Sequence, residues 1–457
     1  MGDNCRVKNF VATAAALVGY QLTICMPYVI CSILIGRLGH SLALSSYGLT
    51  ITIVNMGFYG FAMGIQESIG VVCSRLYGSG NYKTMWKYLW KSLLFVLVVA
   101  GLFHLFSFHS TRALIAINVD KKVAIASGKL LRLMSRSLYL QGINEVMNNF
   151  ISAQDITKPL FYLNIISTGI VFFTGYLFIN HLGYAELGYG YMKICQESFH
   201  FIYYIFILIK YIDLNYVEWP SLKNIKEDFW DFLKENIFTI MTFYADFTAF
   251  EINTYYAALL HNVDALATWA AYGDYITIFI FISVGLGGTM RNLVGKRIGE
   301  SRIHQARTES ISYLKYIGVL SIFLIIIVYL CSDNIAGIFT TKDIVAKNLS
   351  KNIALFTICT YFTLVLPSIN TLYRVLEQER FMIFCTSVVY PVSNIILGYL
   401  LCPYFRFGIV GLNFVFIFTS ISLSITLLLY LYINVDWTNQ DFNDLTNKDD
   451  DAIFDIG

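Results

Sequence analysis

Residues 64–80, GIQESIGVVCSRLYGSG, and residues 285–301, GLGGTMRNLVGKRIGES, are two copies of one pattern, 221 positions apart. In each copy an apolar helix meets a basic residue and then a glycine, Gly78 or Gly299. Basic residues are typical of the lipid interface, and glycine is typical of a helix end where the backbone takes up a positive φ. The pattern predicts two helices that leave a membrane in the same direction.

The composition places the whole chain in a membrane. Apolar residues make up 57% of the 457 residues and charged residues only 14%, and the mean hydropathy is +0.61. Apolar stretches recur along the sequence, and about 20 such residues span the hydrocarbon core as a helix. We predict twelve membrane-spanning helices, near 11–35, 44–73, 88–108, 123–151, 160–179, 186–210, 237–260, 264–294, 311–331, 346–375, 380–402 and 408–433.

The two copies lie six spans apart, and an even number of spans preserves direction. Parallel repeats of six helices are an architecture of transporters, with the substrate site between the halves. The predicted fold class is therefore all-α and integral to the membrane, with twelve helices in two parallel-repeat bundles. The predicted parts are an N-terminal bundle at 1–210, a cytosolic linker at 211–236, a C-terminal bundle at 237–433 and an acidic cytosolic tail at 434–457.

Basic residues in the short loops predict the orientation of the helices. Cytosolic loops hold the excess of Lys and Arg. The connection after the second span carries four basic residues from Arg75 to Lys91, and the one after the eighth carries four from Lys296 to Arg307. We expect both connections to be cytosolic, although the third and ninth connections depart from this trend. With an even number of spans, both termini are then expected in the cytosol.

Two carboxyl groups interrupt the apolar run of the predicted seventh span. Asp246 and Glu251 lie in the phrase YADFTAFE, inside the span 237–260. A charged side chain near the bilayer midplane costs about 2.5–3.5 kcal/mol, so such residues are candidates for a functional role. Residues five apart on a helix are rotated by about 140° and separated by about 7.5 Å along its axis. We expect one acid to face a central cavity and the other to point into the C-terminal half.

Four motifs resemble the multidrug and toxic compound extrusion (MATE) family of transporters, in its eukaryotic type. The segment 36–39, Gly-Arg-Leu-Gly, resembles the family's Gly-His-Leu-Gly, and 73–81 resembles the end of its second helix. The segment 294–299 resembles the family's Val-Gly-Asn-x-Leu-Gly, and 246–251 resembles the Glu-Trp-Trp-x-x-Glu of its seventh helix. The resemblance covers nearly the whole chain and implies the fold of that family.

The resemblance also implies where coupling ions bind. The family has a further Glu in its eighth helix, and the same spacing from the Val-Gly-Asn glycine leads to Asp274 in this chain. Acids that some relatives carry in helices 1 and 10 are replaced here by Cys31 and Thr363. Proton coupling or cation binding is therefore expected at Asp246, Glu251 and Asp274, with a structural hydrogen bond or ion pair as the alternative for each.

Substrate-binding candidates are polar or aromatic. Gln21 and Asn55 occupy positions that resemble polar residues of the family's first two helices, and Tyr244, Phe247 and Tyr272 are rings near the acids. Aromatic faces suit flat organic cations, because cation–π contacts contribute about 0.5–2 kcal/mol. The alternative is structural: rings of this kind usually pack against lipid or other helices, and amides join neighbouring helices by hydrogen bonds.

Other charged residues in the apolar helices are interpreted as structural first. Lys193 and Glu197 are four apart on the sixth span, with His200 nearby, so the first two can pair directly. Glu67 and Glu145 have Asn and Gln neighbours, which predicts a polar seam within the N-terminal half.

The sequence predicts a secondary active antiporter that exports organic cations or related xenobiotics in exchange for protons. A sodium-coupled exporter and a flippase for lipid-linked sugars, both from the same superfamily, are the alternatives. No catalytic triad, phosphate-binding loop or metal-ligand cluster stands out, so neither an enzyme nor a cofactor or metal is expected. The expected partners are small organic cations and the lipid bilayer, without nucleic acid. The protein is expected to act as a monomer in the plasma membrane or a vacuolar or vesicular membrane.

Overall fold

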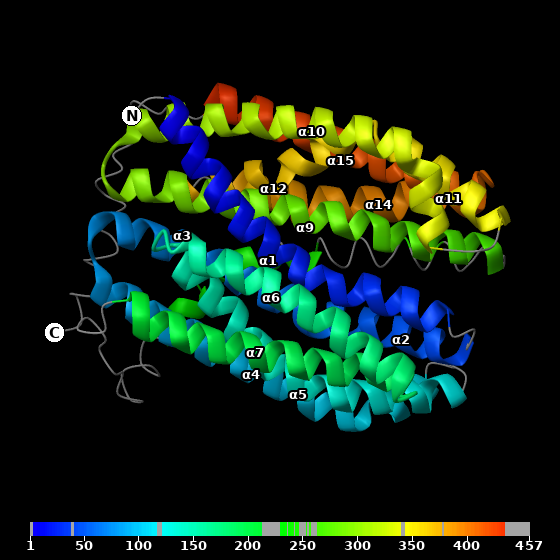
Figure 1. The fold of residues 1–457 in the computed structure, drawn as a ribbon. Helices are drawn as coiled ribbons and strands as arrows, with labels where there is room; N and C mark the ends of the chain where they lie inside the picture. Colours follow the sequence, from blue (N-terminus) through cyan, green and yellow to red (C-terminus); the bar gives the residue numbers. More distant parts are fainter. Residues whose placement is uncertain are drawn as a thin grey trace.

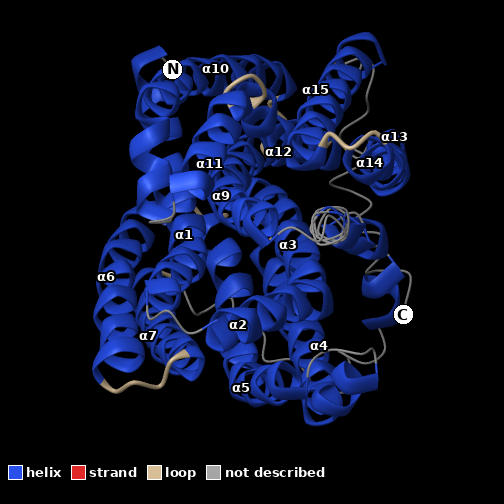
Figure 2. Ribbon diagram, turned by 90° about the vertical axis from the view of Figure 1, so that its right-hand side faces the viewer, coloured by secondary structure: helices blue, strands red, loops and turns tan. Residues whose placement is uncertain are grey.

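A computed structural model of the chain shows helices joined by short connections. It describes residues 3–37, 41–116, 121–212, 229–234, 236–241, 243–245, 253, 256, 263–339, 343–376 and 379–434. Within these ranges all regular secondary structure is helical (Figure 2).

The α-helices of the described part are long, and several continue through a π-helical turn. Such turns follow α2, α6, α13 and α14, over Asn55–Tyr59, Tyr176–His181, Cys385–Val389 and Leu400–Tyr404. The helices are α1 (Asp3–Arg37), α2 (Ser41–Val54), α3 (Gly60–Ser79), α4 (Tyr82–Ala116), α5 (Lys121–Ser152), α6 (Thr157–Gly175), α7 (Glu186–Tyr211), α9 (Val263–Gly299), α10 (Ile303–Phe339), α11 (Asp343–Phe356), α12 (Thr360–Val375), α13 (Glu379–Phe384), α14 (Tyr390–Tyr399) and α15 (Gly408–Asn434).

The spans agree with the predicted ones wherever the structure describes them. Nine helices of the described part are long and apolar enough to cross a membrane, and a pair bent by 56°, Ala346–Phe356 with Thr360–Val375, brings the number to ten. The predicted span 123–151 is also a helix, α5, but it is too polar to be counted with these. The predicted span 237–260 lies mostly outside the described residues.

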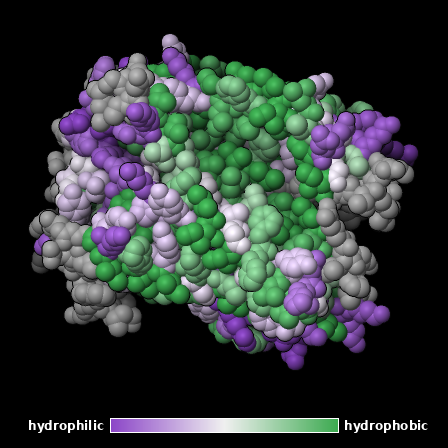
Figure 3. All heavy atoms as spheres, viewed as in Figure 1, coloured by the Kyte–Doolittle hydropathy of each residue, from purple (hydrophilic) through white to green (hydrophobic). Residues whose placement is uncertain are grey.

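The surface of the molecule carries an apolar belt between polar ends (Figure 3). In α10 the large side chains from Ile322 to Leu330 are mostly exposed, although this is the most apolar of the spans. A helix that is apolar on all sides and exposed in the monomer is solvated by lipid tails rather than by water. The belt therefore marks the part of the protein that lies in the bilayer.

The helices form two halves that lie side by side (Figures 1 and 2). The N-terminal half contains α1 to α7, and the C-terminal half contains α9 to α15. The long helix α1 crosses between them and packs on both α6 and α9 (Figure 1). Most of the predicted linker lies outside the described residues, and the predicted domain boundaries stay predictions.

Backbone conformations repeat at the same offset as the sequence. Gly80 and Ser301, which follow α3 and α9, both take a left-handed conformation, with φ of 80° and 58°. Ala185 and Arg406 also have positive φ, at 46° and 58°, and each pair is 221 residues apart. A positive φ is rare in residues other than glycine, such as Ala185, Ser301 and Arg406, so two matched pairs are not expected by chance. The internal repeat therefore extends from the helix ends to the loops before α7 and α15.

Gly78 and Gly299 do not have the role that the sequence suggests. They were expected to end their helices with a positive φ, but positions 80 and 301 take this conformation instead. A Cβ atom on Gly78 would overlap the carbonyl oxygen of Lys296, and one on Gly299 would overlap that of Arg75. Both glycines are needed because α3 and α9 cross in close contact at this point.

Substitutions at the matched left-handed pair are expected to change stability in opposite directions. Gly80→Ala should lower the free energy of unfolding by about 1 kcal/mol, because an L side chain is strained at this φ. Ser301→Gly should raise it by a similar amount for the same reason. No neighbouring atom lies within 4 Å of the position that a Cβ on Gly80 would take, so crowding does not contribute. Denaturant unfolding of the purified protein measures both changes.

Gly169→Ala is the matched control for this pair. Gly169 lies inside α6, and nothing lies within 4 Å of an added Cβ. Alanine favours a helix interior by up to about 1 kcal/mol over glycine, so this variant should be neutral or stabilised. If Gly80→Ala behaves like Gly169→Ala, position 80 is not left-handed in solution.

Candidate functional site between the two halves

The crossing of α3 and α9 brings the two copies of the repeated segment into contact. Ser74 lies against Gly295, and its hydroxyl donates to the carbonyl oxygen of Arg291 at 3.4 Å. The guanidinium of Arg291 lies over Gly70, where a Cβ would overlap it. Ser74 and Gly295 are 221 positions apart, as are Gly70 and Arg291. Equivalent residues meet only near a two-fold axis, so this contact lies close to the pseudo-symmetry axis of the molecule.

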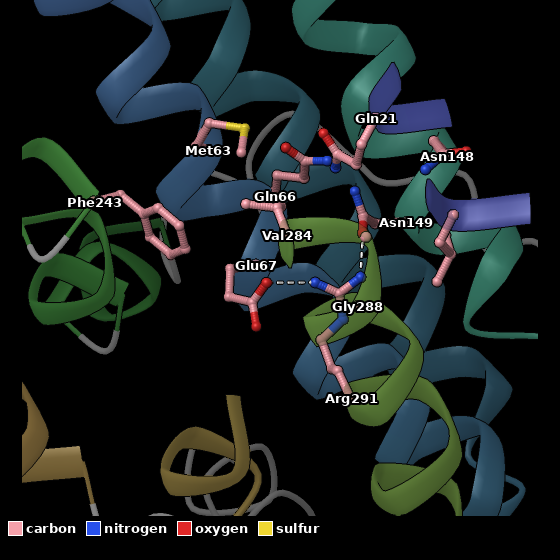
Figure 4. A pocket seen from close by; sticks show the side chains of 12 residues that line it. Gln21, Met63, Gln66, Glu67, Asn148, Asn149, Phe243, Val284, Gly288 and Arg291 are labelled. Atoms are coloured by element: carbon pink, nitrogen blue, oxygen red, sulfur yellow. Dashed lines mark hydrogen bonds and ion pairs between the residues drawn. The ribbon is translucent and has the colours of Figure 1, made fainter. Parts of the chain in front are cut away.

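A small cavity lies above this crossing, between the halves. It has about 310 Å³ of space, including space open to solvent. Helices α1, α3, α5 and α9 contribute to it, together with the segment that contains Phe243 (Figure 4). Half of its twelve lining residues carry amide or charged side chains. The lining residues are Leu17, Gln21, Met63, Gln66, Glu67, Asn148, Asn149, Phe243, Val284, Gly285, Gly288 and Arg291.

A buried ion pair joins the halves in the wall of this cavity. Nη1 of Arg291 in α9 donates to Oε2 of Glu67 in α3 at 2.7 Å, and the two side chains are only 3% and 7% exposed (Figure 4). Burial of both charges is costly unless their remaining donors and acceptors are also satisfied. Neighbouring helices of both halves satisfy them.

The other oxygen of Glu67 contacts a second helix of the C-terminal half. The Thr371 hydroxyl in α12 donates to Oε1 of Glu67 at 2.9 Å, and Nη1 of Arg374 lies 3.7 Å from the same oxygen. The guanidinium of Arg374 also lies over the ring of Phe243, 4.8 Å from its centre. One carboxylate of the N-terminal half therefore holds two arginines of the C-terminal half.

Polar contacts from α5 complete the connection. Nη2 of Arg291 donates to Oδ1 of Asn149, and Nδ2 of Asn292 donates to the Ser152 hydroxyl at 3.1 Å. At the end of the crossing, Lys296 pairs with Asp155. Each contact joins a side chain of α9 to the α5 helix or the connection after it. The halves are thus held together at this end by hydrogen bonds and ion pairs, which can be exchanged for contacts with water when the halves separate.

The structure places four of the predicted substrate-binding residues. Gln21 lines the cavity between the halves. Asn55 begins the π-helical turn after α2 and is half-buried. Tyr244 lies beside Phe61 of α3, with ring centres 5.1 Å apart, and Tyr272 is buried in the C-terminal half, where its hydroxyl donates to Asn413. Gln21 is thus the only one of these four that lines the cavity in the described part of the chain.

The other predicted site residues fall outside the described part. Asp246, Phe247 and Glu251 are not among the described residues, and Asp274 lies within α9 without a described side chain. Their expected roles in ion coupling and substrate binding stay predictions.

The pair between Glu67 and Arg291 was not predicted from the sequence. Glu67 was assigned to a polar seam inside the N-terminal half, but its carboxylate contacts α9 and α12 of the other half. The expected pairing of Lys193 with Glu197 is present, at 2.7 Å. Arg291 is a charged residue in the predicted span 264–294, and the cost of a charge in such a span marks it as a candidate in the same way as Asp246.

Duplicated membrane helices around a cavity between two halves define a transporter fold. Comparison with known proteins is consistent with this class. The chain belongs to the MatE family, whose model matches residues 17–177 and 239–400, one match in each half.

Two curated relatives and one solved structure show how far the similarity extends. Protein DETOXIFICATION 17 of Arabidopsis thaliana is 24% identical over 64% of this chain and 62% of its own length. Multidrug and toxin extrusion protein 1 of Mus musculus is 21% identical over 86% of this chain and 69% of its own length. The crystal structure of the eukaryotic MATE transporter AtDTX14 matches 97% of this chain and 99% of its own, with a TM-score of 0.88 and 17% identity.

These findings confirm the predicted family and fold class. They also confirm that the chain belongs to a family of transporters and not of enzymes. The matched segment spans slightly less than two thirds of the plant relative's length.

Proposed function

We propose that the protein is a secondary active antiporter that exports organic cations or related xenobiotics in exchange for protons. Membership of the MatE family carries this proposal, together with the acids that the seventh and eighth helices contribute. The mouse relative is named a multidrug and toxin extrusion protein, which supports small organic molecules as substrates. Protons are the proposed coupling ion, and no bound cofactor is required.

The contact between the halves supports an alternating-access mechanism. Such a mechanism requires a seal at one end of the cavity that can open while another forms. The Glu67–Arg291 pair and its hydrogen-bonded neighbours form contacts of this kind, because charged groups regain hydration when separated. Basic residues near the ends of α3 and α9, such as Arg75 and Lys296, support a cytosolic location of this end. Both termini are proposed to be cytosolic for the same reason.

Two described residues support a division of labour between Asp246 and Glu251. Tyr244 packs on Phe61 of α3, in the N-terminal half. Asn253 is buried, and its Nδ2 donates to Oδ1 of Asn394 in α14 at 3.1 Å, in the C-terminal half. Tyr244 and Asn253 are nine residues apart, which on a regular helix turns them to opposite faces.

Residues seven apart lie on the same helix face. Glu251 follows Tyr244 by seven residues, and Asp246 precedes Asn253 by seven. We therefore propose that the two acids have different roles. In this arrangement Glu251 is the acid that meets the substrate, and Asp246 is the acid that exchanges protons with Asp274. A carboxyl group that binds a proton or a cation, but not both together, is sufficient for antiport.

The charge of the cavity supports a cationic substrate over a lipid-linked sugar. A flippase for anionic lipid-linked sugars would favour a strongly basic cavity. Glu67 and Arg291 are the charged side chains among the cavity-lining residues that the structure describes, and they neutralise each other. A sodium-coupled exporter differs from the proposal only in its ion, and the choice of gradient in the transport experiment distinguishes the two.

Asp246→Asn and Glu251→Gln are expected to reduce proton-driven transport strongly. Uptake of a fluorescent organic cation into proteoliposomes, under an imposed proton gradient, measures the effect. We expect a loss of about 5–150-fold, the range of typical coupling free energies between two ligands. Asp246→Asn should lose gradient-driven uptake but keep substrate binding, whereas Glu251→Gln should lose both.

Asp231→Asn is the matched control for these variants. Asp231 pairs with Lys234 at 3.0 Å on the surface, where its side chain is 66% exposed, and exposed pairs contribute little. Its uptake should equal that of the wild type. Unchanged uptake in both Asp246→Asn and Glu251→Gln would contradict the assignment of these acids to coupling. Uptake that follows a sodium gradient alone would identify sodium, and not the proton, as the coupling ion.

A further inference from the structure

The N-terminal half contains a second group of buried charges, away from the cavity. Lys193, Glu197 and His200 of α7 are buried, as is Glu145 of α5. Nζ of Lys193 donates to Oε1 of Glu197 at 2.7 Å, and Nδ2 of Asn144 donates to Oε2 of Glu197 at 2.8 Å. The ammonium of Lys193 and the carboxylate of Glu197 therefore compensate each other.

Glu145 has no cation of its own. Its Oε1 accepts a hydrogen bond from Nε2 of Gln141 at 3.0 Å, and its Oε2 has no hydrogen-bond partner among the described residues. The residue is 1% exposed. Two carboxyl groups thus share the surroundings of one ammonium group, which is already bound to Glu197.

The remaining neighbours cannot neutralise a carboxylate at this position. His200 lies beside Glu197 rather than Glu145, with 3.8 Å between Nδ1 and Oε2 of Glu197, and its Nε2 is hydrogen-bonded to the Ser167 hydroxyl at 2.7 Å. The other titratable groups around Glu145 in the described part of the chain are hydroxyls of four buried tyrosines: Tyr20 and Tyr28 of α1, Tyr59 of the π-helical turn and Tyr204 of α7. Among the described residues, Lys193 is thus the cationic neighbour of Glu145, and it is already paired with Glu197.

An ionised carboxylate without a counter-charge is strongly unfavourable in a buried site, and the group takes up a proton instead. We propose that Glu145 is a second proton-binding site of this transporter, in the N-terminal half, and that its carboxyl group carries a proton in the conformation described here. The site is separate from Asp246, Glu251 and Asp274. Its use in transport rests on the proposed antiport function, whereas its occupation by a proton does not.

A chain of hydrogen bonds connects this site to the contact between the halves. Nδ2 of Asn149 donates to the backbone carbonyl oxygen of Glu145 at 2.9 Å, and Oδ1 of Asn149 accepts from Arg291, which pairs with Glu67. Asn148, in the same turn of α5, lines the cavity and accepts from the Tyr204 hydroxyl at 3.4 Å. Separation of the halves would break the Asn149–Arg291 bond one helical turn from Glu145 and bring water close to it. Because water stabilises the ionised carboxylate, the proton is released when the halves open.

Infrared spectroscopy of the purified protein in lipid nanodiscs tests the occupation of the site without any transport. The wild type at neutral pH is expected to show the carbonyl stretch of a protonated carboxylic acid that Glu145→Gln lacks. Glu145→Asp should keep a band at a shifted frequency, because the acid remains but its hydrogen bonds change. A role in packing alone predicts no such band and no such shift.

Glu309→Gln is the matched control. Glu309 is also buried, at 3%, but it is paired with Nε of Arg297 at 3.2 Å and so has a counter-charge of its own. Its substitution should leave the carboxylic acid band unchanged. The proposal is overturned if Glu145→Gln and the wild type have the same band. It is also overturned if exchange of potassium for sodium at constant pH removes the Glu145 band, because a metal cation would then be the ligand.

Transport provides the second measurement. In proteoliposomes Glu145→Gln should lose the dependence of uptake on the proton gradient, while exchange of labelled for unlabelled substrate without a gradient continues. If gradient-driven uptake in this variant equals that of the wild type, the site has no part in coupling and that part of the proposal fails. Loss of uptake in Asp246→Asn is independent of this result, so the failure of one proposal is distinguishable from the failure of the other.

Discussion

Glu67→Gln is expected to open the contact between the two halves. The substitution removes the negative charge that holds Arg291 and Arg374, so that two buried arginines of the C-terminal half lose their counter-charge. Removal of one partner of a buried pair costs about 3–5 kcal/mol. This cost falls on the closed conformation, because the arginines are hydrated once the halves separate. It corresponds to a shift of about 100- to 4,000-fold in the closed-to-open equilibrium.

The native cysteines measure this opening. Cys73 is fully buried in α3, in the same apolar core of the N-terminal half as Cys31, but its neighbours Gly70 and Ser74 both contact α9. Cys31 and Cys359 are fully buried in the cores of the N-terminal and C-terminal halves. Alkylation by a membrane-permeant maleimide, followed peptide by peptide with mass spectrometry, should be faster at Cys73 alone in Glu67→Gln. Faster reaction at all three cysteines would indicate unfolding, and an unchanged rate at Cys73 would contradict the prediction.

The double variant Glu67→Gln with Arg291→Gln tests whether the opening is caused by the uncompensated charge or by the altered shape of the side chain. It removes one of the two uncompensated arginines and keeps polar side chains of similar length. We expect its Cys73 to react more slowly than in Glu67→Gln alone, with a coupling free energy of about 0.5–3 kcal/mol between the two sites. Equal rates in the single and double variants would show that the ion pair does not hold the halves together.

Gly299→Ala is expected to prevent the close crossing of α3 and α9. The added methyl group would overlap the backbone carbonyl oxygen of Arg75, which cannot move without shifting α3. Overpacking of this kind costs about 1–3 kcal/mol or more, and here it destabilises only the closed contact. Gly78→Ala should have the same effect from the other helix, because its methyl group would overlap the carbonyl oxygen of Lys296. Both variants should accelerate alkylation at Cys73 and reduce substrate transport.

Gly48→Ala provides the control with identical chemistry. Gly48 lies inside α2, and nothing lies within 4 Å of an added Cβ. This variant should be as stable as the wild type or slightly more stable, because alanine favours a helix. If Gly299→Ala and Gly48→Ala have the same alkylation rate at Cys73 and the same transport rate, close contact at Gly299 is not required for the closed state.

The helices and their order were predictable because a bilayer leaves few alternatives. A span needs about 20 apolar residues and must satisfy its own backbone hydrogen bonds, so composition alone indicates where helices cross the membrane. The predicted spans coincide with the described helices, including α5, which is too polar to be recognised as a span without its place in the series. The offset of 221 residues holds beyond the two helix ends from which it was found. The same offset relates the positive φ angles of Gly80 and Ser301, and those of Ala185 and Arg406.

The contacts between side chains were less predictable. Lys193 and Glu197 could be paired from the sequence because residues four apart on one helix are always neighbours on its surface. Glu67 could not be paired in this way. Its partner Arg291 is 224 residues away, and the choice between a neighbour in its own half and one in the other half depends on how α3 and α9 cross.

The sequence by itself determined that this protein is a duplicated bundle of membrane helices of the MATE type, because hydropathy and an internal repeat are properties of the chain. The tertiary structure alone decided what the repeated segments do, which is to meet each other near the pseudo-two-fold axis and join the halves through Glu67 and Arg291. Each residue along a helix turns the side chain by about 100°, so the face that meets another helix depends on packing across the whole bundle. For this reason Glu67, which was predicted to lie in a polar seam within the N-terminal half, lies instead in the contact between the two halves.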